Sequence, residues 1–81
     1  MNILFIADPL SKFKIVKETT YAMMKSAQAR GHKVWACVAR DIRSVGCIQA
    51  HAQRIVLKDH PEPTNWYSVV EEYEHPLSFY D

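Results

Sequence analysis

The sequence predicts an α/β domain of the Rossmann-like type, in which parallel strands are joined by a helical crossover and followed by a β-hairpin. The first observation is a run rich in Ile, Leu and Phe, Asn2–Ala7, that stops at Asp8-Pro9. The second is an amphipathic stretch that ends at Gly31, and the third is another apolar run, His32–Val38, immediately after it. Strand, helix and strand in this order are typical of a parallel βαβ unit.

The two apolar runs are expected to be neighbouring strands. Neither contains the regular polar alternation of a half-exposed strand, so each fits a strand that is covered on both faces. Pro9 cannot donate a ladder hydrogen bond, so the first strand must end near it. The connection between the helix and the second strand is very short, which places that strand parallel to the first and beside it.

The helix is expected from about Glu18 to Arg30, because this stretch has no glycine or proline and is rich in helix formers. Thr19 is the expected N-cap, with Glu18 the second candidate, and Gly31 is the expected left-handed C-terminal cap. One apolar face is predicted from residues at three- and four-residue spacing, namely Thr20, Met23, Met24 and Ala27.

The second half of the chain predicts a β-hairpin about Gly46, with arms Ile42–Val45 and Cys47–Leu57. The second arm alternates between an apolar side and a polar side, which indicates an edge or antiparallel strand. A loop is expected over Lys58–Asn65, and a short helix over Asn65–Tyr73. Since no further strand follows to cover the Trp35 strand, we expect the sheet to be incomplete and residues 1–81 to be one domain completed from elsewhere.

The amino-acid composition and net charge limit the classes of function that the chain can have. The 81 residues are 48% apolar and carry a net charge of +1 with mixed signs, which favours a folded globule and argues against a nucleic-acid surface. No run reaches the ~20 apolar residues of a membrane span, and no signal peptide is recognised. Cys37 and Cys47 fit neither a disulfide scaffold nor a zinc site, and Cys37 is expected to be buried. We therefore expect a cytoplasmic protein, and a homo-oligomer because so short a chain buries little surface.

A loop of three lysines, Lys12, Lys14 and Lys17, leads to the start of the predicted helix. Each cation near a helix N-terminus costs roughly 0.3–1 kcal/mol, and such local conflicts tend to occur at functional sites. A carboxylate or phosphate held by the backbone N–H groups would resolve the conflict. The alternative is a solvated loop whose lysines point into water.

Three further residues join this candidate site. Thr19 and Thr20 could add hydroxyl donors to the predicted anion site. Asp8, at the end of the first strand, could orient a substrate amine or a lysine, or could equally cap the turn at Pro9.

Other chemistry is not indicated. The chain has only two glycines, which excludes a P-loop and the dinucleotide-binding fingerprint. The four histidines have no metal-like spacing. Glu71, Glu72 and Glu74 are interpreted as a solvated helix face, and no nucleophile and base can be paired.

At the level of motifs, the chain resembles the start of bacterial glutathione synthetase. The segments that carry the resemblance are Asp8-Pro9-Leu10, Ile15, residues 17–24, residues 27–32, Ala50-His51-Ala52-Gln53-Arg54, Asn65-Trp66-Tyr67 and His75-Pro76-Leu77. Their order and spacing cover essentially the whole chain. The resemblance implies a pre-ATP-grasp N-terminal domain.

This resemblance also implies a function. The family joins γ-glutamylcysteine to glycine with ATP and Mg²⁺ through an acyl phosphate, and its ATP-grasp region, absent here, supplies the nucleotide and metal ligands. Residues 1–81 would then be the substrate-side domain, inactive alone, with the rest of its own polypeptide as partner and no cofactor ligands of its own. Asp8, Lys17, Thr19 and Thr20 match the loop that faces the peptide substrate, whose carboxylates suit an anion site.

Some positions depart from the family pattern. Glu18 stands where the family more usually has Asp, and Lys12 and Lys14 stand where Asn-like residues are also found. Two alternatives stay open at this point. One is the N-terminal half of a glycosyltransferase with two Rossmann-like domains, which usually has a glycine-rich loop after its first strand. The other is a non-catalytic α/β interaction module that pairs through an open sheet edge.

Overall fold

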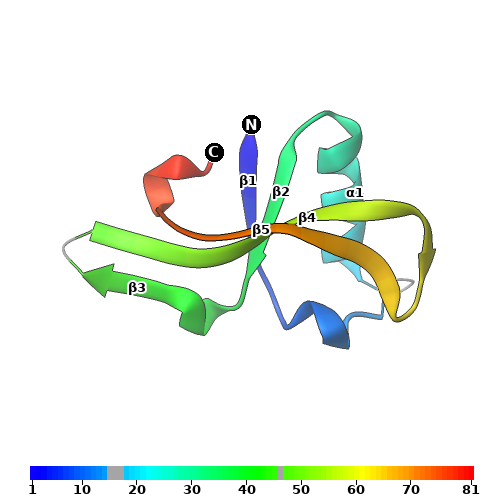
Figure 1. The fold of residues 1–81 in the computed structure, drawn as a ribbon, viewed down its shortest axis with the longest axis horizontal. Coiled ribbons are helices and arrows are strands. Elements are labelled where there is room, and N and C mark those ends of the chain that lie inside the picture. Colours follow the sequence, from blue (N-terminus) through cyan, green and yellow to red (C-terminus); the bar gives the residue numbers. More distant parts are fainter. Residues whose placement is uncertain (15–17, 46) are drawn as a thin grey trace.

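The computed structural model describes residues 1–14, 18–45 and 47–81 as an open five-stranded α/β sheet (Figure 1). The elements are β1 (Asn2–Ile6), α1 (Thr19–Ala29), β2 (Lys33–Cys37), β3 (Ile42–Val45), β4 (Cys47–Glu62) and β5 (Asn65–Pro76). Three short 3-10 helices are η1 (Leu10–Lys12), η2 (Ala39–Asp41) and η3 (Leu77–Phe79). The predicted α/β class is confirmed.

The β1–α1–β2 crossover is formed as predicted. β1 and β2 are parallel, with Ile3 opposite Val34 and Phe5 opposite Ala36. The pairing continues past the strand ends, because the Ala7 N–H donates to the Cys37 carbonyl at 3.0 Å. The carboxyl ends of both strands therefore meet at one edge of the sheet.

Helix α1 differs from the prediction in its start and its buried face. Glu18, not Thr19, occupies the N-cap position, and its side chain makes no capping hydrogen bond. The buried residues are Tyr21, Met24 and Ala27, whereas Met23 is 56% exposed. The predicted stripe was rotated because Tyr21, whose ring packs against the hairpin, was left out of it. Gly31 has φ +83°, which confirms the left-handed cap.

The hairpin of β3 and β4 is confirmed, with antiparallel pairs from Val45 opposite Cys47 to Ile42 opposite Ala50. The loop predicted over Lys58–Asn65 is wrong, because β4 continues to Glu62 and turns only at residues 63–64. The helix predicted over Asn65–Tyr73 is also wrong, because β5 pairs antiparallel with β4 along this segment. Its aromatic and β-branched residues favour a strand when a partner strand is available.

Strand β4 lies in the interior of the sheet rather than at its edge. β2 and β3 pair with successive parts of one side of β4, and β5 pairs with the other side. In the described part of the chain, β1 and β5 are the outermost strands of the order β1-β2-β4-β5, and β3, which pairs only with β4, also has one unpaired side. In Figure 1 the long β4–β5 hairpin crosses in front of β1 and β2, with β3 near one end of it and α1 near the other.

The two outer strands differ in how they are protected. β5 carries one extra residue, Val70, between the pairs Arg54–Glu71 and Ile55–Val69, and such a bulge hinders edge-to-edge pairing. Its glutamates add charge. β1 has no charged residue, and Asp81 binds only its first residue, through the N–H and carbonyl of Asn2. Within the described ranges no strand lies on the outer side of either.

Two cores lie on opposite faces of the sheet. The larger core, under α1, includes Met24, Val34, Ile55, Leu57 and Trp66. The smaller core is centred on Trp35, with Cys37, Ala50 and Ala52, and Cys37 is buried as predicted. The expectation that the Trp35 strand is left uncovered is wrong.

The C-terminal segment covers Trp35, which is 1% exposed. The rings of His75, Phe79 and Tyr80 contact its indole edge-on, with centroids 5.4, 5.7 and 5.9 Å away. The indole N–H also donates to the Asn2 side chain at 3.1 Å. The segment thereby brings the C-terminus beside β1. No helix in the described part of the chain is long and apolar enough to span a membrane.

Candidate functional site

A cavity of about 530 Å³, which we call the crossover groove, lies where the carboxyl ends of β1 and β2 meet the start of α1. This is the position at which open α/β sheets bind ligands. Its lining residues are Ile6, Ala7, Asp8, Pro9, Phe13, Glu18, Thr20, Val38, Ala39 and Arg40. The size falls within the range of about 300–1,000 Å³ that is usual for small-molecule sites.

A second cavity of about 280 Å³, the hairpin groove, continues from the first. It lies between η1, η2 and the polar part of β4 and β5. Its lining residues are Pro9, Leu10, Ser11, Ala36, Cys37, Val38, Arg40, Asp41, His51, Gln53, Tyr67 and Glu72. Pro9, Val38 and Arg40 line both cavities, so the two form one continuous depression.

Four residues were predicted as the site, and the structure brings two of them to the crossover groove. Asp8 and Thr20 line it. Thr19 is exposed and does not line either cavity. Lys17 lies outside the described residues, so its place in the site stays a prediction.

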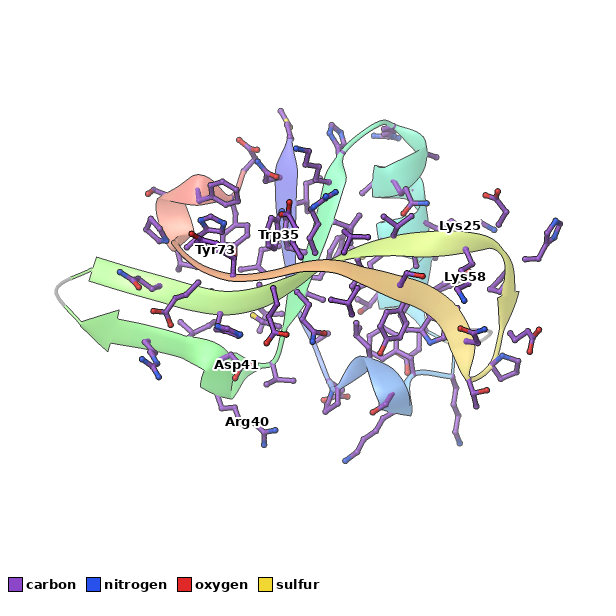
Figure 2. All side chains as sticks on the ribbon, in the orientation of Figure 1. Lys25, Trp35, Arg40, Asp41, Lys58 and Tyr73 are labelled. Atoms are coloured by element: carbon purple, nitrogen blue, oxygen red, sulfur yellow. The ribbon has the colours of Figure 1, made fainter. Side chains whose placement is uncertain are left out.

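The other two lysines of the loop do not support the lysine cluster. Lys12 and Lys14 are exposed, and neither lines the crossover groove or the hairpin groove. Among the described residues, the positive charge at the two grooves comes from Arg40, which was not predicted as a site residue. Arg40 and Asp41 project from η2 beside the end of β2, away from the chain termini (Figure 2).

Among the described residues, Arg40 is the cationic side chain that lines both the crossover groove and the hairpin groove. Its side chain is exposed and makes no ion pair or hydrogen bond with any other described residue. The N–H groups of Thr19, Thr20 and Tyr21 at the start of α1 also lack carbonyl partners within the helix. A guanidinium and a helix N-terminus at the same cavity can together bind a carboxylate.

Acidic groups balance this positive charge. Asp8 and Glu18 line the crossover groove, and Glu18 lies at the N-cap, where a negative charge is favoured by the helix dipole. In the hairpin groove, Glu72 Oε2 lies 2.7 Å from His51 Nε2. Hydrogen bonds from His51 and Gln53 hold the pKa of the Glu72 carboxyl below its usual value. The depression as a whole therefore suits a ligand with charges of both signs.

The sequence model of one protein family spans all the elements that form the two grooves. It describes the N-terminal domain of prokaryotic glutathione synthetase, and it matches residues 1–81. The chain belongs to that family. The assignment agrees with the resemblance noted from the sequence and does not favour a glycosyltransferase.

Curated relatives agree with the family. The chain is 42% identical to the glutathione synthetase of Gloeobacter violaceus over 78 residues, which are 96% of this chain and 24% of that protein. It is 31% identical to that of Neisseria meningitidis serogroup A over 86 residues, which cover 100% of this chain and 26% of the relative. It is 60% identical to that of Ralstonia nicotianae over 37 residues, 46% of this chain and 11% of the relative. The chain thus spans about a quarter or less of these relatives.

The residues that the sequence-based interpretation missed in this family member follow a simple rule. Arg40 and Asp41 come shortly after β2, just as Asp8 comes shortly after β1. Since the ends of parallel strands meet, the argument that selected Asp8 also selects Arg40. His51 was predicted only not to be a metal ligand, and Glu72 was interpreted as part of a solvated helix face; the pairing of β4 with β5 brings the two together. The three glutamates lie on a strand, not on the expected helix face.

Proposed function

We propose that this chain is the substrate-side N-terminal domain of a glutathione synthetase, which joins γ-glutamylcysteine to glycine at the expense of ATP. The chain is inactive alone and works together with the rest of its own polypeptide. The family membership supports the parent reaction. The single structural observation that carries the proposal is the crossover groove, which combines Arg40, Asp8 and the start of α1 in one cavity.

The chemistry of this groove suits the peptide substrate. γ-Glutamylcysteine carries two carboxylates and one ammonium group. Arg40 and the free N–H groups at the start of α1 offer partners for a carboxylate, and charge-assisted hydrogen bonds of this kind are the stronger ones. Asp8 in the crossover groove and Glu72 in the hairpin groove are acidic groups that could each pair with the ammonium group. Their positions hold the peptide at the mouth of the crossover, where the remaining polypeptide can reach it.

Nucleotide and metal binding are not assigned to this chain. The described residues contain no group of three or more His, Cys, Asp or Glu side chains placed to hold a metal ion. The sequence also lacks a glycine-rich phosphate loop. The ligands for ATP and Mg²⁺, the homo-oligomer and the cytoplasmic location stay predictions.

A chimera tests the proposal. Residues 1–81 replace the matching quarter of the Gloeobacter violaceus relative, and phosphate release is measured with γ-glutamylcysteine, glycine and ATP-Mg²⁺. We expect activity that requires both substrates, and none from the 81-residue chain by itself. A folded chimera without activity, or an active short chain, would contradict the proposal.

The same chimera tests the role of the groove. Arg40→Gln is expected to raise the KM for γ-glutamylcysteine about tenfold with little change in kcat, because a charge-assisted hydrogen bond is worth about 1.5–3 kcal/mol. Arg30→Gln is the matched control, since Arg30 is also exposed but lies at the opposite end of α1. Equal effects of the two substitutions would remove Arg40 from the site.

A further inference from the structure

The hairpin groove is not needed to hold a single carboxylate, yet it is the more polar part of the depression. Its polar side chains come from η1, η2, β4 and β5, and are Ser11, Arg40, Asp41, His51, Gln53, Tyr67 and Glu72. Two of these are carboxylates and one is a guanidinium. An α-amino acid end, with an ammonium and a carboxylate on one carbon, carries the complementary charges.

Pairing in the sheet fixes these side chains on one face. Gln53 lies opposite Glu72 in the β4–β5 ladder and opposite Ala36 in the β2–β4 ladder. Because side chains alternate along a strand, His51 lies on the same face as Gln53. Helix α1 covers this face further along, over Val34, Ile55 and Leu57. The part over Ala36, Gln53 and Glu72 is left open as the floor and wall of the groove.

Glu72 has two partners but retains acceptor capacity. Its Oε2 lies 2.7 Å from His51 Nε2, and Gln53 lies opposite Glu72 in the ladder and, with His51, lowers the pKa of its carboxyl. An ionised carboxylate offers about four acceptor positions. An incoming ammonium group can therefore bind Glu72 without displacing either partner, and His51 and Gln53 hold the carboxylate in place.

We infer that the hairpin groove binds the free α-amino acid end of the peptide substrate, with its ammonium group on Glu72 and its α-carboxylate on Arg40. The inference rests on the proposed function and adds the direction in which the peptide lies. The glutamyl end occupies the hairpin groove. The cysteinyl end, whose carboxylate reacts, lies in the crossover groove at the N–H groups that begin α1.

The test compares γ-glutamylcysteine with N-glutarylcysteine, which lacks only the α-amino group. Binding of each to the 81-residue chain is measured by NMR titration, and KM for each is measured in the chimera described above. Glu72→Gln is expected to weaken the binding of γ-glutamylcysteine about three- to tenfold. The binding of N-glutarylcysteine is expected to stay unchanged or to improve slightly. The effect should appear in both Kd and KM.

Glu71→Gln is the matched control. Glu71 is the neighbouring residue on β5, and it also forms a cross-strand ion pair, with Arg54 at 3.3 Å. It lies on the opposite face and does not line the groove. The thermal midpoints of the two variants show whether either substitution has disturbed the fold, and they are expected to agree closely.

The possible results separate the two hypotheses. If the chimera is active but Glu72→Gln affects both ligands equally, affects neither, or acts like Glu71→Gln, the inference is overturned and the proposed function stands. If the chimera folds but has no activity, the proposed function fails and the inference fails with it. Weaker binding of γ-glutamylcysteine, without weaker binding of N-glutarylcysteine, supports the inference.

Discussion

The two halves of the chain form their sheet in different ways. In the crossover half, β1 and β2 are short and parallel, and α1 covers them. In the hairpin half, β4 and β5 are long and antiparallel, and much of their surface is exposed; Val69, Val70 and Tyr73 are examples. The hairpin half depends on a few buried residues that dock it against the crossover half. The hairpin groove is lined by residues of both halves, so it exists only while the two halves stay docked.

Trp66 is the residue expected to matter most for this docking. It is 1% exposed, and its ring stacks on Phe13 with centroids 5.4 Å apart and meets Tyr21 edge-on at 5.3 Å. Trp66→Ala should lower the free energy of unfolding by about 3–5 kcal/mol, measured by urea denaturation. Tyr73→Ala, on the same strand but 61% exposed, should cost less than about 1 kcal/mol. Equal losses would mean that the halves are not docked through Trp66.

A pair of hydrogen bonds ties the halves together next. Gln28 of α1 donates to the Leu57 carbonyl at 3.1 Å and accepts from the Leu57 N–H at 2.7 Å. Gln28→Ala leaves both backbone groups of a buried residue without this partner, so it should cost about 1–3 kcal/mol of stability. Lys58→Ala removes an exposed bond to Asn65 and should cost less than about 0.5 kcal/mol. A Gln28 variant as stable as the wild type would contradict this role.

Gly31 ends α1 inside the crossover half. Its φ is +83°, and an added Cβ would meet no atom within 4 Å. Gly31→Ala should therefore cost only the backbone strain of a left-handed residue, about 1–2 kcal/mol. Gly31→Asn should cost less, because Asn tolerates this region. Thermal unfolding measures the stability of both variants. A Gly31→Ala variant as stable as the wild type would show that the left-handed cap is not formed.

The smallest expected effect concerns pH. Burial, with a contribution from Asp41, raises the pKa of the Cys37 thiol above its ordinary value of 9.0. The unfolded chain then loses this proton at a lower pH than the folded chain. The stabilising contribution is thus complete below pH 9.0 and is lost as the pH rises toward the folded value. In the Cys37→Ala variant, the free energy of unfolding should fall less steeply above that pH. If the variant loses stability as steeply as the wild type does, Cys37 is not the cause of the fall.

The comparison of the halves also explains what could be predicted. The crossover half was predicted because its signals are local: an apolar run, a proline stop, a helical period and a glycine cap. In the hairpin half the residues 65–73 fit a helical face when taken alone. Only the antiparallel partner, β4, turns their aromatic and β-branched residues into a strand. The spacing of apolar residues within one segment does not show which distant segment of the chain will pair with it.

The candidate site was predicted in part for the same reason. Asp8 and Thr20 were found because the end of the first strand and the start of the helix are visible in the sequence. His51 and Glu72 are 21 residues apart. His51 lies on the predicted second arm of the hairpin, but Glu72 lies in the segment predicted as a helix, so the ladder that joins them was not predicted. Arg40 was missed although its signal, the end of the second strand, was present.

Hydrogen exchange in the presence of γ-glutamylcysteine tests the central claim most directly, namely that the ligand is held where the ends of β1 and β2 meet the start of α1. The account predicts slower exchange of the Thr19, Thr20 and Tyr21 amides, with no change at the Thr64 amide in the β4–β5 turn. Unchanged exchange at the start of α1 with saturating ligand, or equal protection at the turn, would contradict it.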